Sequence, residues 1–287
     1  MSEVLLTRKL PAERVRRRRF PLLIGLAFVF VAAVAVLAAF GPLIAPKDPN
    51  AQNLLVGLSG PSQSYWLGTD GAGRDLVSAM LYGLRISLAV GVVSCLIATA
   101  IGAAVGLTAA YAGGRVESLL MRLVDLQLSF PAILIALMLI AILGKGVDKI
   151  IFALVTVQWA YYARTVRGTA LAEMSKEYVE AARCLGLSHA RIVFKHILPN
   201  VLPPLIVVAT VQAAHAIALE ATLSFLGVGL PRTEPSLGLL ISNGFEYMLS
   251  GKYWISFFPG AVLHVTIMAI NLVGDQLRDV LNPRLRR

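Results

Sequence analysis

Residues 20–46 read FPLLIGLAFVFVAAVAVLAAFGPLIAP, and none of them is charged. About 20 apolar residues in a helix are enough to cross the hydrocarbon core of a bilayer, so this stretch predicts a transmembrane anchor. It is longer than the apolar part of a signal peptide, and Pro42 and Pro46 end it without a clear small-residue cleavage site. We therefore expect a retained first span, preceded by a basic cytoplasmic tail at residues 1–19.

The composition of the whole chain is also typical of a membrane protein. Its 287 residues are 57% hydrophobic and 15% charged, whereas soluble domains are nearer half apolar and a quarter charged. So few charges could not cover the surface of a water-soluble enzyme, and the same figures exclude disordered, collagen-like and disulfide-framework proteins. Cys95 and Cys184 form no metal-binding or disulfide pattern, and we interpret both as free thiols.

Further charge-free stretches predict five more spans and hence an all-α membrane protein with six transmembrane helices. The fourth of the six is short, and polar residues lie near its end. The five stretches are residues 86–114, 126–144, 150–163, 201–219 and 253–274, which place spans 2–6 in a core at residues 86–275.

The distribution of Lys and Arg predicts the orientation of these spans. With a cytoplasmic N-terminus, 19 of the 26 cations lie on inner segments and 7 in outer loops, as the positive-inside rule requires. Both terminal tails, residues 1–19 and 276–287, are then cytoplasmic. Membrane orientation and attraction to anionic lipid account for the net charge of +10, so nucleic acid is not needed as a partner.

The predicted extracytoplasmic loop, residues 47–85, has a turn-rich first part and a helical second part. Apolar residues from Leu76 to Leu84 recur at helical spacing and predict an amphipathic helix at the membrane interface. Between the two parts lies GTDGAGRD, whose charged residues we interpret as caps and local ion pairs. The residues singled out in this outer-loop motif are Gly68, Thr69, Asp70, Gly73, Arg74 and Asp75.

The predicted inner loop, residues 164–200, carries the signals of two short helices. Ser175 suits the cap of the first, and Gly186 suits the left-handed position that follows its last turn. Ser188 suits the cap of the second, which we expect to end before Pro199. Such a helix–turn–helix, at about residues 175–200, favours a docking element for a cytoplasmic partner over a loop that lies on the membrane surface.

The same segment resembles the EAA-loop signature of bacterial ABC importer permeases. In that signature EAA is followed after three residues by glycine, and after nine more by I-x-L-P. His196 stands where isoleucine is usual, as in the HxLPN form of peptide-type permeases. The matching residues are Glu180, Ala181, Ala182, Gly186, His196, Leu198 and Pro199.

Other segments resemble motifs of the same subfamily, in the same order along the chain. Residues 68–75 resemble GTDxxGRD, and residues 162–168 resemble YARxVRG. Residues 223–238 resemble LSFLGxG followed by PSWG, with Leu237 in place of the usual tryptophan, and residues 271–284 resemble the C-terminal motif. The chain is thus similar to the inner-membrane permease subunit of dipeptide, oligopeptide and nickel importers.

This resemblance implies a transport role and a set of partners. The chain would form half of a translocation path for short peptides delivered by an extracytoplasmic binding protein. A second permease subunit would complete a heterodimer, and two ATPase subunits would use ATP and Mg and act through the EAA loop. Nickel chelates, glutathione or another small solute are the alternative cargo. The sequence identifies no substrate-binding residue.

The chain itself is not expected to be an enzyme. It contains no G-x-x-x-x-G-K-[ST] phosphate loop, so we expect it to bind no cofactor of its own. An intramembrane hydrolase is the remote alternative, because residues 57–60 resemble a GxSG nucleophile motif. Ser59 lies in a polar loop with no base held beside it, and we interpret this motif as a turn.

Polar residues inside apolar spans are further candidates for function. Hydrogen bonds between helices are the favoured interpretation of the histidines, ahead of proton relay or metal binding. Gly102 and Gly106 form a GxxxG motif that favours packing within the chain, and Pro203 with Pro204 is expected to kink or delay the fifth span. The polar candidates are Gln158, Gln212, His215, Glu220, His264 and Asn271.

Overall fold

The computed structural model describes residues 21–231 and 233–281, and the regular secondary structure of this part of the chain is helical apart from one isolated bridge between Thr69 and Asp75. The all-α prediction is therefore confirmed. The predicted N-terminal tail lies outside the described residues, as does the second half of the C-terminal one, residues 282–287. The main helices are α1 (Pro21–Ile44), α2 (Leu76–Ala112), α3 (Gly114–Ser129), α4 (Ala132–Leu143), α5 (Val147–Met174), α6 (Glu177–Cys184), α7 (His189–Arg191), α8 (Leu198–Phe225), α9 (Leu237–Phe245) and α10 (Trp254–Leu281).

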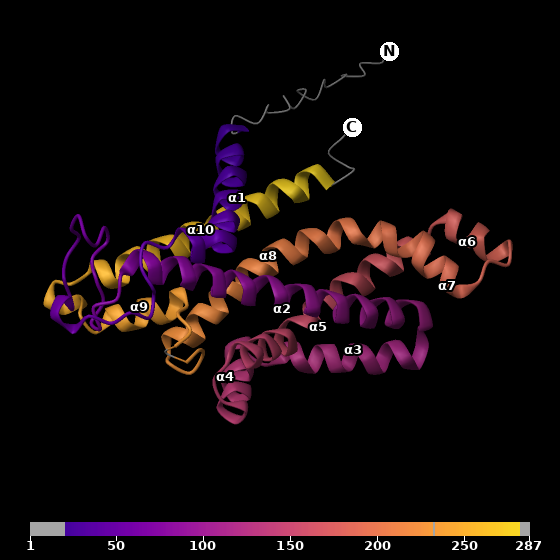
Figure 1. The fold of residues 1–287 in the computed structure, drawn as a ribbon. Helices are drawn as coiled ribbons and strands as arrows, with labels where there is room; N and C mark the ends of the chain where they lie inside the picture. Colours follow the sequence, from indigo (N-terminus) through magenta and orange to yellow (C-terminus); the bar gives the residue numbers. More distant parts are fainter. Residues whose placement is uncertain (1–20, 232, 282–287) are drawn as a thin grey trace, which may run out of the picture.

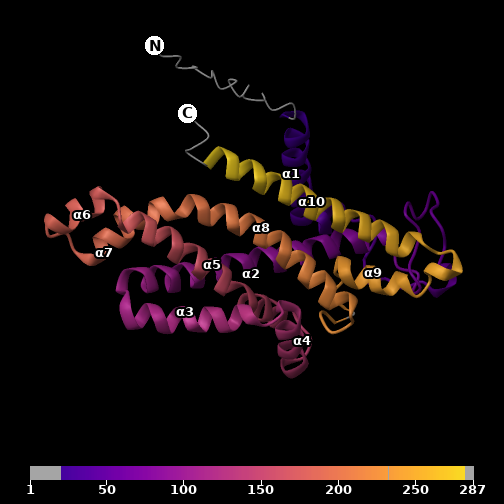
Figure 2. The ribbon, with the colours of Figure 1, turned by 180° about the vertical axis from the view of Figure 1, so that it is seen from behind.

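The long helices α2, α5, α8 and α10 run along one bundle (Figures 1 and 2). The α6–α7 hairpin lies at one end of this bundle, and α9 with the loop before α2 lies at the other. Two short 3-10 helices, Leu54–Val56 and Met248–Ser250, belong to the end that holds α9, and a π-helical segment, Ile192–Ile197, joins α7 to α8. The hairpin and the loop before α2 thus lie at opposite ends of the bundle (Figure 1).

Four described helices are long and apolar enough to cross a membrane, and a fifth crossing is possible if the bent pair α3–α4 counts as one. The four are α1, α2, the continuous helix His189–Phe225 and α10. The charge-free part of α5, residues 150–163, is shorter than a bilayer crossing requires. The structure accordingly supports four or five candidate spans, and the count of six stays a prediction.

The predicted third span, residues 126–144, is not one continuous helix. Residues 126–129 belong to α3, and the axes of α3 and α4 differ by 89°. The bend falls at Phe130, whose φ of −96° and ψ of 144° are extended. Because Pro131 follows, its ring disfavours helical backbone at Phe130 and separates the two helices there.

Long helices extend into both predicted loops. The predicted interfacial helix is the first part of α2, and Leu76 and Met80 are buried against Trp254 and Leu240. The predicted inner loop begins inside α5, which continues to Met174. No proline interrupts residues 164–174, so nothing local stops the helix there.

The GxxxG motif on α2 packs against α5, which confirms the prediction of packing within the chain. A Cβ atom on Gly102 would lie 2.5 Å from the carbonyl oxygen of Trp159 and 2.5 Å from Cβ of Tyr162. A Cβ atom on Gly106 would lie 2.5 Å from the carbonyl oxygen of Ala163. Both positions require a residue without a side chain, since the two backbones approach closely here.

Candidate functional site: the α6–α7 hairpin

The first helix of the hairpin ends in a Schellman motif, as the glycine predicts. Gly186 has a φ of +70°. Its amide donates to the carbonyl of Arg183 at 3.0 Å, and the amide of Leu187 donates to the carbonyl of Ala182 at 3.2 Å. These two bonds satisfy carbonyls that the end of the helix leaves free, and they turn the chain sharply toward α7.

The two serines do not cap helices through their side chains, so these predictions are wrong in detail. Ser175 ends α5, and its hydroxyl donates to the carbonyl of Ala172 at 3.0 Å, while Lys176 occupies the cap position of α6. Ser188 occupies the cap position of α7, but its side chain accepts no capping hydrogen bond. Both helix starts depend on packing rather than on a local cap.

The second helix of the hairpin does not end before Pro199, contrary to the prediction. It passes through the π-helical segment and continues directly into α8, with Pro199 in the first turn of α8. The amide of Leu198 donates to the carbonyl of Val193, five residues earlier. Proline is tolerated in a first turn because its missing amide hydrogen needs no partner there. Pro203 and Pro204 also lie inside α8, so they do not delay its start.

One side of the hairpin is anchored in the core and the other is exposed. The side chains of Val179, Ala182, Ile192 and Ile197 are buried in a cluster with Tyr162 and other residues of α2, α5 and α8. Of the EAA residues, Glu180 and Ala181 are exposed whereas Ala182 is buried. The exposed side also carries Arg183, Leu185, His189, Arg191 and Phe194. This mixed apolar and basic surface is open to a partner.

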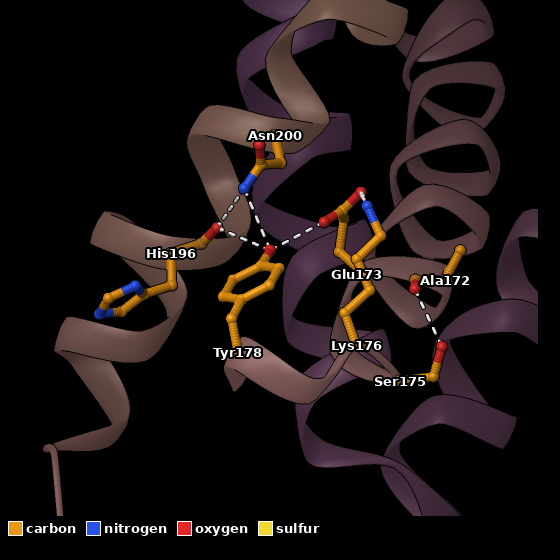
Figure 3. A network of polar contacts seen from close by, with 7 residues as sticks. All are labelled: Ala172, Glu173, Ser175, Lys176, Tyr178, His196 and Asn200. Carbon is orange, nitrogen blue, oxygen red and sulfur yellow. Dashed lines mark hydrogen bonds and ion pairs between the residues drawn. The ribbon is translucent and has the colours of Figure 1, made fainter. Parts of the chain in front are cut away.

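A polar network joins the hairpin to α5 and α8 (Figure 3). The hydroxyl of Tyr178 donates to Oε2 of Glu173 at 2.8 Å, and Lys176 Nζ pairs with Oε1 of Glu173 at 2.5 Å. Asn200 Nδ2 donates to the Tyr178 hydroxyl at 3.1 Å and to the carbonyl of His196 at 2.8 Å. These contacts tie the start of α6 to the start of α8.

The network changes the protonation of two of its members. Burial by itself would raise the pKa of Glu173, but hydrogen bonds from Lys176 and Tyr178 outweigh it and hold that pKa below its usual value. Burial and the neighbouring carboxylate of Glu173 raise the pKa of Tyr178. The contribution of Glu173 to stability is therefore present above the ordinary pKa of a glutamate and is lost as the pH falls through its lowered value.

Tyr178→Phe should loosen α6 from the bundle. The substitution removes the hydroxyl that links Glu173 and Asn200, and a hydrogen bond to a charged group contributes about 1.5–3 kcal/mol. We expect amide hydrogen exchange to rise several-fold across residues 177–184 and to stay unchanged in α2. The difference in α6 between the variant and the wild type should shrink as the pH falls through the lowered pKa of Glu173, because the wild type then loses the same contact. Tyr253→Phe, at an exposed tyrosine beyond the hairpin, is the control. Unchanged exchange in α6 would show that the network does not hold the hairpin.

No local pattern in the sequence predicts this network, because its members come from three separate helices. Glu173 and Tyr178 belong to no recognised motif, and Asn200 is the last residue of the HxLPN form, which says nothing of its contact with them. A second contact was equally unforeseen: the Tyr111 hydroxyl on α2 is hydrogen-bonded to Nδ1 of His189 on α7, and their rings meet edge to face with centroids 5.5 Å apart. Both ends of the hairpin are therefore attached to the bundle.

The outer-loop motif forms a compact hydrogen-bonded turn at the end of the bundle opposite the α6–α7 hairpin. Asp70 accepts hydrogen bonds from the amides of Ala72 and Arg74 and pairs with Arg74 Nε at 2.7 Å. Asp75 Oδ2 accepts from the amide of Ser78 at 2.9 Å and so caps α2. These contacts confirm caps and a local ion pair as the interpretation of the charged residues.

The small residues of this motif also have structural roles. Thr69 donates its hydroxyl to the carbonyl of Val56 at 2.6 Å and receives a hydrogen bond from the amide of Ser59 at 2.9 Å. Gly68 and Gly73 have φ values of +85° and +72°. The chain turns at Gly57 and Leu58, so the GxSG resemblance is a turn, as predicted.

Glu220 on α8 is fully buried and joins three helices. Its Oε2 accepts from the hydroxyl of Ser87 on α2 at 2.7 Å, and its Oε1 accepts from Ser224 at 2.7 Å. The Ser87 hydroxyl in turn accepts from the amide of Leu237 on α9 at 3.3 Å. The glutamate thus holds the outer-loop end of α2, α8 and α9 together.

Of the remaining polar candidates, Gln158, Gln212 and His215 line one cavity, whereas His264 and Asn271 on α10 do not line it. Gln158 donates from Nε2 to the carbonyl of Gln212 at 3.4 Å, across α5 and α8. No hydrogen bond joins His215 or His264 to another helix within the described ranges, so the predicted interhelical bonds are not observed. Across residues 21–231 and 233–281 no three His, Cys, Asp or Glu side chains are grouped as a metal site would require. Cys95 is buried and Cys184 exposed, and both are free thiols, as predicted.

Comparisons with known proteins agree with this architecture. Residues 101–287 match the family described as "Binding-protein-dependent transport system inner membrane component". A protein of Brucella suis biovar 1 (strain 1330) is 41% identical over 285 residues, which cover 99% of this chain and 93% of that protein. The dipeptide transport system permease protein DppC of Bacillus subtilis (strain 168) is 39% identical over 252 residues, 88% of this chain and 79% of that one.

A solved structure shares the fold at lower sequence identity. An inward-facing form of the MetNI methionine ABC transporter contains a chain with a TM-score of 0.58 and 23% identity, covering 71% of this chain and 96% of that one. At this identity the likeness concerns the fold alone. Because the family match covers most of the sequence and close relatives span nearly all of it, this chain belongs to the binding-protein-dependent transport system inner membrane components, the permease subunits of bacterial ABC importers.

Proposed function

We propose that this chain forms one half of the translocation path of an ATP-driven importer of short peptides. The observation that carries the proposal is the 39% identity to a dipeptide transport system permease over 88% of the chain. In this proposal an extracytoplasmic binding protein delivers the peptide, a second permease subunit forms the other half of the path, and two ATPase subunits supply the energy.

The proposed arrangement in the inner membrane has six spans and two cytoplasmic termini. It counts the short apolar part of α5 as a span and α3–α4 as one broken span. The excess of Lys and Arg supports this orientation, since 19 of the 26 cations then face the cytoplasm. The α6–α7 hairpin lies on the cytoplasmic side in this arrangement, and α9 with the outer-loop motif lies on the other.

The α6–α7 hairpin is proposed to receive the motion of the ATPase subunits. It is anchored by buried Val179 and Ile197 and by the hydrogen bonds of Tyr178, so a force on its exposed side is transmitted to α5 and α8 rather than absorbed locally. The exposed Glu180, Arg183 and Leu185 are the proposed contacts with the ATPase. ATP and Mg are used by those partners and not by this chain.

The test is uptake of labelled di- and tripeptides by cells that carry the gene, cells that lack it and cells in which a plasmid restores it. The proposal expects uptake to disappear with the gene and to return with the plasmid. If peptide uptake is equal in all three strains, peptides are not the cargo, and uptake of nickel, glutathione and sugars by the same strains identifies the class of solute instead.

A further inference from the structure

A cavity of about 330 Å³ lies between α4, α5 and α8. Five of its lining side chains carry polar groups, and the others are apolar. No Asp, Glu, Lys or Arg lines it. The polar lining residues are Gln158, Tyr161, Gln212, His215 and Thr222.

Gln158 carries the strongest indication that a ligand occupies this cavity. It is 3% exposed, and its Oε1 is buried without a hydrogen-bond partner among the described residues. A buried polar atom without a partner costs about 1–3 kcal/mol, so native proteins rarely leave one unsatisfied. A donor that enters the cavity would satisfy this oxygen. The side chains of Tyr161 and His215, which also have no hydrogen-bond partner within the described ranges, would add further polar contacts.

The polar residues lie on one face of each helix. On α8, Gln212, His215 and Thr222 are three and seven residues apart, a spacing that places them on the same side of a helix. On α5, Gln158 and Tyr161 are likewise three residues apart. Both helices thus present a polar face to the same cavity.

The opposite faces of the same helices are apolar. Phe152 is 54% exposed and lies nine residues before Tyr161, half a turn away around α5. Ile206 is 46% exposed and lies nine residues before His215, half a turn away around α8. Exposed polar groups are costly in hydrocarbon, so the apolar faces suit lipid and the polar face suits a water-lined path.

We propose that this cavity is a subsite of the translocation path and that it hydrogen-bonds the backbone amides of a passing peptide. The inference rests on the proposed function. A carboxamide offers a donor and an acceptor, which match the C=O and N–H groups of a peptide bond. Since the lining holds no carboxylate, ammonium or guanidinium, the subsite binds the backbone common to all short peptides and not a particular side chain.

The size and neutrality of the cavity suit transport rather than tight binding. Ligand pockets occupy about 300–1,000 Å³, so this one holds part of a short peptide at a time. Conduction through a path requires binding that is favourable enough for entry and weak enough for release. A few neutral hydrogen bonds meet both conditions, since each contributes only about 0.5–1.5 kcal/mol.

The first test replaces Gln158, whose Oε1 has no partner, in the complete transporter with all its subunits. Gln158→Leu should lower peptide uptake about three- to tenfold at saturating loaded binding protein, the loss expected for one or two hydrogen bonds. Its thermal stability should be equal to or above that of the wild type, because a buried unsatisfied oxygen is removed. A merely structural role for Gln158 predicts the opposite change in stability.

The matched control is Gln127→Leu. Gln127 lies on α3, away from the cavity, and donates from Nε2 to the carbonyl of Thr156 at 3.0 Å. Uptake by this variant should stay near that of the wild type. Unchanged uptake by Gln158→Leu, or an equal loss in both variants, would overturn the subsite.

The second test asks whether the polar face is accessible to water. Its readout, the labelling of introduced cysteines, does not depend on which solute is transported. His215→Cys and Thr222→Cys are introduced with Cys184→Ser, which removes the exposed native thiol. Ile206→Cys and Phe152→Cys are the controls. Along the bundle, Ile206 lies between the cavity and the α6–α7 hairpin, and Phe152 lies on the other side of the cavity. A charged maleimide should label the first pair about tenfold faster, because a thiol in apolar surroundings forms little thiolate.

Added dipeptide, its binding protein and ATP should slow the labelling of His215→Cys. If the transporter imports peptide but the peptide does not slow this labelling, the subsite is overturned. If the wild-type transporter imports no peptide, the proposed function fails separately. Labelling then still decides whether this face lines a path: faster labelling of His215→Cys than of both controls supports the path, and equal rates overturn it.

Discussion

Gly102→Val should disrupt the packing of α2 against α5 and greatly lower the yield of folded protein. A Cβ atom at Gly102 would lie 2.5 Å from the Trp159 carbonyl oxygen and 2.9 Å from the Ala163 amide nitrogen. Backbone atoms cannot move aside as a flexible side chain can, so the two helices have to separate. Overpacking of a tight core costs about 1–3 kcal/mol, and we expect a value near the upper end.

The measurement is the midpoint of thermal unfolding in detergent, together with the folded fraction in size-exclusion chromatography. Gly168→Val is the matched control, because Gly168 is also helical but a Cβ atom there would meet nothing within 4 Å. The same downward shift in both variants would show that the loss comes from valine in a helix and not from the contact between α2 and α5. Gly106→Val should behave like Gly102→Val.

Gly186→Val should leave the protein inserted in the membrane but reduce transport about tenfold, if left-handed backbone costs a branched residue about 1–2 kcal/mol. Gly186 has a φ of +70°, and a Cβ atom there would meet nothing within 4 Å. The substitution therefore acts through the backbone alone. It disfavours the Schellman turn between α6 and α7 and changes how the hairpin presents Glu180 and Leu185 to the ATPase.

Gly186→Asn is the control for this prediction, since asparagine tolerates the left-handed conformation better than other residues with a side chain. It should keep most of the uptake. The measurements are peptide uptake and ATP hydrolysis stimulated by the loaded binding protein, both relative to the amount of transporter in the membrane. Normal uptake by Gly186→Val at a normal amount would remove this glycine from the coupling mechanism.

Several features were predictable because they depend on residues close together in the chain. The left-handed turn at Gly186 and the capping of α2 by Asp75 are of this kind. The apolar stretch of α1 is another, since its length and lack of charge alone specify a helix that suits a bilayer. The packing role of Gly102 was predictable as well, although its partner helix was not.

Other features could not be predicted because they depend on contacts between distant segments. The length of α5 is an example, since residues 164–174 look polar enough for a loop but Val166 and Ala170 are buried against other helices. The start of α7 is another example, because Ser188 occupies the cap position but its side chain makes no cap hydrogen bond. Local signals state what a segment prefers, and tertiary contacts override weak preferences.

The sequence by itself determined that this is a helical membrane protein, which family it resembles and where its hairpin turns, because hydropathy, charge and left-handed glycine act over a few residues. Only the tertiary structure decided that α3 and α4 meet at 89°, that Tyr178 joins Glu173 to Asn200, and that Gln158 and His215 line one cavity. The physical reason is that these features depend on the distance between side chains from different helices, and hydropathy and spacing do not contain that distance.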